Sequence, residues 1–297
     1  MQINSNTLAY MFRGFKATFQ GAFDDTPSQL DKIAMTVPST TSTEDYGWMG
    51  AIPGMREWVG DRVIHNLSMH TYSIKNKPFE LTIGVDRDKI EDDQLGIFNP
   101  MIASMGYEAR IHPDKLAYGL LAKGFETPCY DGQYYFDTDH PVVSTDGTVV
   151  SVSNMQAGTG NPWFLIDNTR PLKPIIYQDR KKPNFVALNR EEDTNVFLHK
   201  EYLYGVDMRG NVGFSLWQMA FGSKAELTAA NFELAQAAMG ALTKDGGEPL
   251  GIRPTVLMVG PSNLAAAKKI IEAQLINGGE SNINYKAVDL LQVSWLK

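Results

Sequence analysis

The stretch "PCYDGQYYFDTDHPV", residues 128–142, concentrates the side chains of this sequence that are best suited to chemistry. It holds the only cysteine of the chain, Cys129, and one of five histidines, His140. A thiolate paired with a histidine base is a nucleophile, and a carboxylate can orient the base. The stretch is therefore a candidate hydrolase site that would use Cys129, His140 and either Asp137 or Asp139.

The context of the cysteine argues against that chemistry. No nucleophile-elbow motif surrounds Cys129, and Pro128 disfavours a helix N-terminus that would lower the pKa of the thiol. The dipeptide Asp131-Gly132 is typical of a tight turn. We therefore predict no catalytic residue here, and a loop whose aspartates and His140 cap turns or contact a neighbouring subunit. Its predicted aromatic anchors are Tyr134, Tyr135 and Phe136.

Zinc binding is a second interpretation of the same stretch. Zinc sites use three or four ligands, usually several cysteines or histidines at close spacing. Cys129 and His140 lie eleven residues apart and fall short of that number. His65 and His70 are five apart on an expected strand, so their side chains point to opposite faces. We predict no metal site from these residues.

The acidic run at residues 85–100 invites a calcium interpretation. A calcium loop needs oxygen ligands at alternating positions, a central glycine and a terminal glutamate. Here Arg87 and Lys89 interrupt the acidic positions, and the glycine is misplaced. The run instead predicts a solvated helix start or turn. The acidic residues concerned are Asp86, Asp88, Asp92 and Asp93.

Phosphate and cofactor motifs are also missing. The sequence has no G-x-x-x-x-G-K-[ST] loop. The segment "TVLMVGPSNLAAAKK", residues 255–269, resembles a nucleotide-binding strand, turn and helix. It lacks the G-x-G-x-x-G motif, and its proline removes one N–H donor. We predict no cofactor.

The longest helical pattern of the chain, residues 97–124, precedes the chemical stretch and must position it. Asn99 is an expected cap, Pro100 suits the first turn, and Gly124 is an expected stop. Pro113 inside this pattern predicts a kink or break near His112.

The N-terminal segment has one apolar face at helical spacing, with Ser5 or Asn6 as an expected cap. This helix either belongs to the core of its own chain or packs as an arm on a neighbouring subunit. The apolar face comprises Leu8, Met11, Phe12, Phe15, Phe19, Ala22 and Phe23.

Residues 62–85 read as two extended segments, joined by a turn at "KNKP", residues 75–78. Such a hairpin would project from the body. It follows a loop-like stretch at residues 36–58, which is rich in serine, threonine, glycine and proline.

The second half of the chain mixes strands and helices. Thr228 is an expected helix cap and Pro261 an expected first helical residue. Strands are expected at 147–154, 163–188, 202–221, 255–259 and in the tail, and helices at 228–247 and 261–275.

Composition limits the class of protein. The chain has 297 residues, of which 43% are apolar and 21% charged, as in soluble globular proteins of one or two domains. The net charge of −7 argues against strong general attraction to nucleic acid or to an anionic membrane. A single cysteine excludes an internal disulfide and suits a reducing cytoplasm. We expect neither a signal peptide nor a transmembrane helix.

Several long motifs resemble the Mu-like phage major head subunit family, in order along almost the whole chain. They include "KIAMTVPSTTSTEDYGWMG", "HPDKLAYGLLAKGFETPCYDGQYYFDTDHPV", "NVFLHKEYLYGVDMRGNVGFSLWQMAFGSKAELT" and "LGIRPTVLMVGPSNLAAAKKIIEA". The resemblance implies an α+β tailed-phage major capsid fold of the Hong Kong 97 type. It also implies a structural role and no enzyme.

The resemblance further implies a division of the chain. Residues 1–55 would form an N-terminal arm and connection, and residues 56–86 an extended hairpin loop. Residues 87–223 would form mainly a peripheral domain, with the spine helix at about 97–124. Residues 224–297 would form mainly an axial domain.

The implied function is that of a major capsid protein of a tailed phage or prophage. The chain would assemble in the bacterial cytoplasm with copies of itself, as hexamers and pentamers, into the icosahedral shell of the virion. Expected partners are a scaffold, a portal, decoration proteins and loosely contacted packaged DNA, without a membrane.

Overall fold

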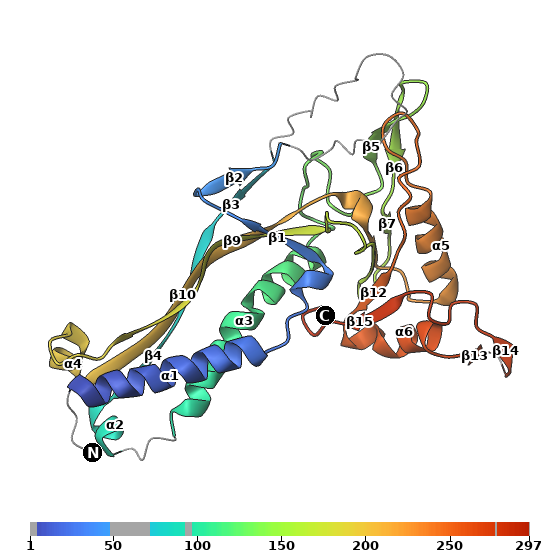
Figure 1. Ribbon diagram of the computed structural model, residues 1–297. Helices are drawn as coiled ribbons and strands as arrows, with labels where there is room; N and C mark the ends of the chain where they lie inside the picture. Colours follow the sequence, from blue (N-terminus) through green and yellow to red (C-terminus); the bar gives the residue numbers. More distant parts are fainter. Residues whose placement is uncertain (1–4, 48–71, 93–96, 277, 297) are drawn as a thin grey trace.

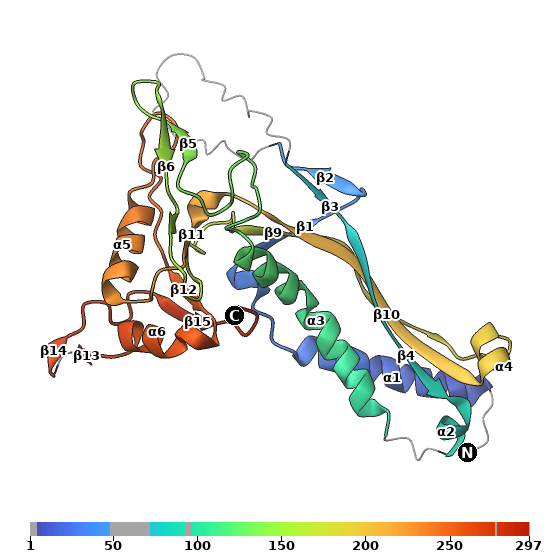
Figure 2. The same cartoon turned by 180° about the vertical axis from the view of Figure 1, so that it is seen from behind.

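The computed structural model describes residues 5–47, 72–92, 97–276 and 278–296. An elongated region contains α1, α3 and a long sheet, and a second region contains α5, α6 and a shorter sheet (Figure 1). The C-terminus lies between the two regions, and the view from behind shows the same division (Figure 2).

The long sheet has four strands in the order β1-β9-β10-β4. β1 is parallel to β9, whereas β10 is antiparallel to both β9 and β4. Along β10 buried and partly buried residues alternate, as expected where one face of a strand packs on a core. The strands are β1 (Ala34–Pro38), β4 (Lys77–Asp86), β9 (Ile175–Leu188) and β10 (Glu201–Phe214).

Helices α1 (Ser5–Asp25) and α3 (Asn99–Ala122) pack on the buried face of this sheet. The Phe15 ring meets Tyr204 edge to face, with ring centroids 5.1 Å apart. The Phe19 ring stacks on Phe185 at 5.1 Å. Of the two interpretations of the N-terminal helix, packing in the core of its own chain is confirmed.

Helix α3 confirms the long helix that the sequence predicts, but it runs through Pro113 without a break. Tertiary contacts hold the backbone on the C-terminal side of the proline. The Asp114 carboxylate accepts hydrogen bonds from Ser28 Oγ at 2.6 Å and from the Gln29 N–H at 2.9 Å. The Tyr118 hydroxyl donates to the Gln29 carbonyl at 2.9 Å.

The predicted turn at "KNKP" is wrong. Residues Ser73–Lys75 form β3, which pairs with β2 (Thr43–Asp45), while β4 pairs with β10. Asn76 between them is buried, and its side-chain amide donates to Ser39 Oγ at 2.7 Å. These contacts replace the predicted turn, and residues 73–75 and 77–86 are strands of two different sheets. The rest of the predicted hairpin, residues 56–71, lies outside the described residues.

The second sheet has five strands in the order β15-β12-β8-β11-β7. Its strands share one apolar core with buried faces of α5 and α6. The predicted cap of α5 is confirmed, because Thr228 Oγ1 accepts a hydrogen bond from the Asn231 N–H at 3.2 Å. The elements are β7 (Met155–Gln156), β8 (Trp163–Ile166), β11 (Ala220–Ser223), β12 (Val256–Val259), β15 (Asp289–Gln292), α5 (Ala229–Gly240) and α6 (Leu264–Ile271).

Shorter elements complete the fold, and they include three 3-10 helices at Leu30–Lys32, Trp217–Met219 and Pro261–Asn263. Within the described part of the chain, no helix combines the length and apolarity needed to cross a membrane. The remaining elements are α2 (Arg87–Asp92), α4 (Thr194–His199), β5 (His140–Val143), β6 (Val149–Val152), β13 (Leu275–Ile276) and β14 (Glu280–Ser281).

Candidate functional site

The loop that leaves α3, residues 123–139, carries the chemical side chains on a small hairpin of its own. The Cys129 N–H donates to the Gln133 carbonyl at 2.8 Å, and the Gly132 N–H donates to the Cys129 carbonyl at 3.2 Å. Gly132 has a φ of 89°, a value that glycine adopts readily. The predicted turn at Asp131-Gly132 is therefore confirmed.

Aromatic side chains fix this loop to the core. The Tyr135 ring stacks on Phe214, with centroids 4.1 Å apart and planes 9° apart. The Tyr135 hydroxyl lies 3.2 Å from both the Pro174 and Leu216 carbonyl oxygens. Tyr135 and Phe136 are fully buried, whereas Tyr134 is 49% exposed. Two of the three predicted anchors are confirmed, whereas Tyr134 is not one of them.

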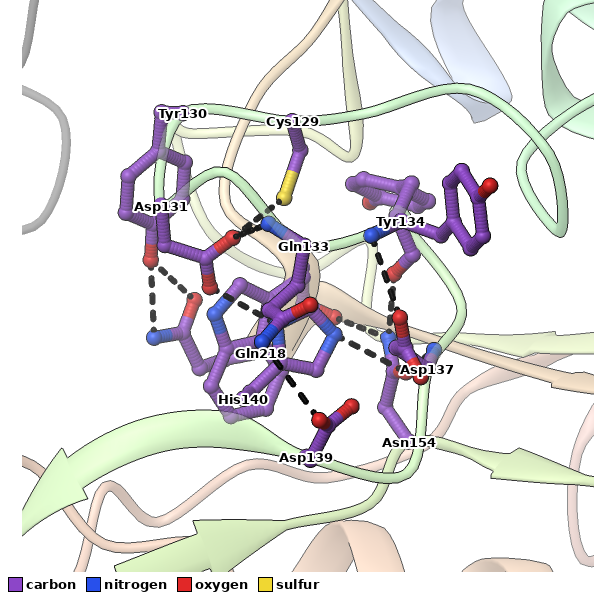
Figure 3. A network of polar contacts seen from close by, with 12 residues as sticks. Cys129, Tyr130, Asp131, Gln133, Tyr134, Asp137, Asp139, His140, Asn154 and Gln218 are labelled. Carbon is purple, nitrogen blue, oxygen red and sulfur yellow. Dashed lines mark hydrogen bonds and ion pairs between the residues drawn. The ribbon is translucent and has the colours of Figure 1, made fainter. Parts of the chain in front are cut away.

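Three reactive groups meet below this hairpin (Figure 3). The Asp131 carboxylate lies between the other two. Its Oδ1 atom is 3.1 Å from Cys129 Sγ, and its Oδ2 atom is 2.7 Å from His140 Nδ1. The ring of His140 is completely buried, and the Asp131 side chain is 7% exposed. Asp131 is thus the carboxylate that bonds His140, in place of Asp137 or Asp139.

The His140 ring is held on its other sides as well. Its Nε2 atom is 3.2 Å from Asn154 Oδ1, and its plane stacks on Trp217 with centroids 4.1 Å apart. Of the two roles predicted for His140, contact with a neighbouring subunit is wrong, because the ring is enclosed by its own chain. Neither Asn154 nor Trp217 was identified from the sequence, since nothing in their spacing relates them to residues 128–142.

This geometry does not activate the thiol. Burial, and then the negative charge of Asp131, raise the pKa of Cys129 well above its ordinary value. Nucleophilic cysteines need the opposite shift. The carboxylate also stands between the sulfur and the imidazole, so His140 is not placed as a base for Cys129. The arrangement supports the prediction of a structural loop over that of a hydrolase.

The same three residues have donor types that zinc accepts. Their ligand atoms lie within 4.8 Å of one another, a grouping that the sequence analysis missed because it left Asp131 out. Ligands on a tetrahedral zinc ion lie about 3.3 Å or more apart, given bonds of about 2.0–2.3 Å. The 2.7 Å between Oδ2 and Nδ1 is a direct hydrogen-bond distance. The cluster therefore fits a chain of hydrogen bonds better than three donors that converge on one ion.

Turn capping, one of the roles predicted for the loop aspartates, is confirmed for Asp137. Its carboxylate accepts hydrogen bonds from the Thr138 N–H at 2.7 Å and the Tyr134 N–H at 3.2 Å. Asp139 instead contacts side chains: Gln133 Nε2 donates to its carboxylate at 3.5 Å, and hydrogen bonding to Asp137 is the main cause of its raised carboxyl pKa.

The other candidate residues are dispersed. Asp86 Oδ1 accepts a hydrogen bond from the Asp88 N–H at 2.8 Å, so the acidic run begins a helix as predicted. Asp88 lies 3.6 Å from Lys200 Nζ in an exposed ion pair. His65, His70 and Asp93 lie outside the described residues.

The segment at residues 255–269 forms the predicted strand, turn and helix, but its glycine has a packing role. A Cβ atom at Gly260 would overlap the backbone carbonyl of Leu296. Glycine is therefore required where the C-terminal segment crosses the turn, which accounts for it without a phosphate.

Comparisons with known proteins identify the family of this chain over almost its whole length. A family model described as Mu-like prophage major head subunit gpT matches residues 8–296. The chain belongs to this family. The major capsid protein of Escherichia phage Mu is 39% identical to this gpT-family chain over 299 residues, which cover 99% of this chain and 98% of the Mu protein. The Mu-like prophage FluMu major head subunit of Haemophilus influenzae is 45% identical over 272 residues, 89% of this chain and 88% of that protein.

Solved structures agree with this assignment. A chain of the bacteriophage JBD30 procapsid is 43% identical, with a TM-score of 0.89 over 99% of this chain and 100% of that chain. A chain of the JBD30 capsid is 34% identical, with a TM-score of 0.79 over 94% of each chain. The gpT-family chain thus has the α+β fold of tailed-phage capsid proteins, as its motifs predicted.

Proposed function

We propose that this gpT-family chain is the major capsid protein of a Mu-like tailed phage or prophage and forms the icosahedral shell around the genome. The observation that carries this proposal is the TM-score of 0.89 to the JBD30 procapsid chain over 99% of the sequence. A likeness of this extent includes both sheets, α1 and α3, so it concerns the whole subunit.

Its principal partner is itself. Hexamers and pentamers are closed rings of heterologous contacts, in which different surfaces of one subunit meet in the ring. Large apolar side chains are exposed at the far end of the long sheet, where Phe197 is 79% and Leu198 61% exposed on α4. Others lie near and along α3, where Ile97 is 75% and Met101 53% exposed. Such side chains are suited to burial between subunits.

The other expected partners follow from the proposed role as a major capsid protein. A scaffold, a portal and decoration proteins complete a tailed-phage head, and the packaged DNA contacts the shell loosely. The net charge of −7 supports the last point, since tight DNA binding requires a basic surface. The protein is located in the virion after assembly in the bacterial cytoplasm.

For the domain division we propose a peripheral domain of α1, α3 and the long sheet. The proposed axial domain contains β12 and β15 with α5 and α6, and also β7, β8 and β11, a grouping supported by the pairing of all five strands in one sheet. In this division, segments before and after residue 223 both contribute to the axial domain.

Expression of the full-length chain, alone and with a candidate scaffold protein from the same phage or prophage, tests the function. Negative-stain microscopy should show shells or capsomers. A protein that stays monomeric in both cases would contradict the proposal. No enzymatic activity is proposed, because the thiol, the imidazole and the carboxylate are committed to one another in the interior.

A further inference from the structure

The side-chain amide of Asn154 determines which protons the buried ring of His140 carries. Asn154 Nδ2 donates to the Tyr135 carbonyl at 2.8 Å, and Asn154 Oδ1 accepts from the Asp137 N–H at 2.9 Å. These two bonds fix the orientation of the amide. The atom that faces His140 Nε2 at 3.2 Å is thus an acceptor, and Nε2 must carry a proton.

The other ring nitrogen faces a second acceptor. His140 Nδ1 is 2.7 Å from Asp131 Oδ2. The second oxygen of this carboxylate accepts from the Cys129 thiol and from the Gln133 N–H, each at 3.1 Å. A neutral imidazole has one N–H, which Nε2 already uses. Without a second proton, two lone pairs would face each other across 2.7 Å in the interior.

We propose that His140 is a buried imidazolium paired with the Asp131 carboxylate, and that this bound proton holds loop 123–139 at the junction of the two sheets. The charges balance, because the cation faces one anion and Cys129 is neutral. The parallel face of Trp217, 4.1 Å away, favours a cation over a neutral ring.

The groups around the ring favour this distribution of the proton. Burial raises the pKa of Asp131, but hydrogen bonds from His140 and Cys129 and the imidazolium charge outweigh it, so that the net shift is downward. The carboxylate is therefore the ionised partner. Asp139 on the adjoining loop adds a second negative charge near the ring. Trp217 of the 3-10 helix and Asn154 after β6 face the ring with uncharged groups.

The proton affects the junction because the cluster bonds to both sides of it. The Asn154 amide also lies 3.3 Å from the Ala220 carbonyl, where β11 of the five-stranded sheet begins. Tyr135 contacts the Pro174 and Leu216 carbonyls, which adjoin β9 and β10 of the long sheet. Without this proton, the lone pair of His140 Nδ1 would face the Asp131 carboxylate, and the bonds to both sheets would weaken together.

Nitrogen NMR of the wild-type protein tests the protonation directly. Full-length protein labelled with 15N-histidine would be sedimented and studied by magic-angle spinning at about pH 7.5, where an exposed histidine is mostly neutral. The His140 signal is the one that disappears in His140→Gln. Two protonated ring nitrogens are expected. A single protonated nitrogen would overturn the proposal.

Asp131→Asn is the matched variant for the protonation state. Its amide can donate to a neutral Nδ1 and still accept from Cys129 and Gln133, so the ring needs no extra proton. In the same NMR experiment Asp131→Asn should show one protonated ring nitrogen at His140 where wild type shows two. Two protonated nitrogens in both proteins, or one zinc ion per chain in the purified protein, would overturn the proposal.

Discussion

Gly106 of α3 lies directly against the backbone carbonyl of Phe19 in α1, so that a Cβ atom at position 106 would overlap that oxygen. The same atom would be 3.1 Å from both Ala22 Cβ and the Phe23 nitrogen. The two helices therefore approach backbone to backbone at this point, and the aromatic face of α1 reaches the long sheet because they do.

Gly106→Ala should destabilise the subunit by about 1–3 kcal/mol, the usual cost of an extra methyl group in a closely packed core. The obstacle is backbone, which a side-chain rotation cannot move. Gly119→Ala in the same helix is the control, because nothing lies within 4 Å of a Cβ atom there. That variant should gain up to about 1 kcal/mol from helix propensity. Urea unfolding measures both, and equal effects would contradict the close contact.

The aromatic face of α1 provides the second prediction. Phe19 is 2% exposed and stacks on Phe185, so Phe19→Ala should cost about 3–5 kcal/mol. Tyr10 on the same helix is 68% exposed, and Tyr10→Ala should stay within about 0.5 kcal/mol. Thermal or urea unfolding would separate the two. A mild effect at Phe19 would mean that α1 leaves the sheet in solution.

Acid should weaken the turn before β2 through Glu44. The Thr41 and Thr40 N–H groups and the Ser39 hydroxyl bond its carboxylate and lower its pKa to about 2. Because the folded pKa is depressed, the stabilisation is present above the unfolded value and is lost as pH falls from about 4.5 towards about 2. Glu44→Gln should flatten the stability profile in that window, compared with Glu272→Gln at an exposed carboxylate. An unchanged profile would show that the turn does not depend on the charge.

The Cys129→Ser variant distinguishes a structural role of the thiol from a catalytic one. A serine hydroxyl can still donate to Asp131, so the variant should fold with a loss of about 1–3 kcal/mol for a buried polar replacement. It should assemble like the wild type in negative-stain images. If the variant lost an enzymatic activity of the purified wild type, the structural interpretation of the cluster would be wrong.

Local patterns predicted much of this fold, because they reflect local physics. The apolar spacing of α1, the cap at Thr228 and the turn at Asp131-Gly132 depend on residues close in sequence. The prediction of a turn at "KNKP" was wrong because the strands on either side of it pair with β2 and with β10 and not with each other. Asn76 between them also donates a hydrogen bond to Ser39. Those partners are distant in sequence, and periodicity does not identify them.

The buried cluster shows the same limit. The stretch around Cys129 was identified correctly as unusual, and its loop character was predicted. The partner of His140 was assigned among the wrong aspartates, because only the folded loop turns the Asp131 carboxylate toward the His140 ring. Asn154 and Trp217 complete the ring environment from distant elements, and neither residue has a spacing that would indicate it.

Cryo-electron microscopy of particles from cells that produce the phage tests the central claim most directly. The account predicts icosahedral shells in which this chain is the most abundant protein and in which the long sheet, α1 and α3 fit the repeated subunit density. Particles whose shell density belongs to another protein, with this chain absent, would contradict it.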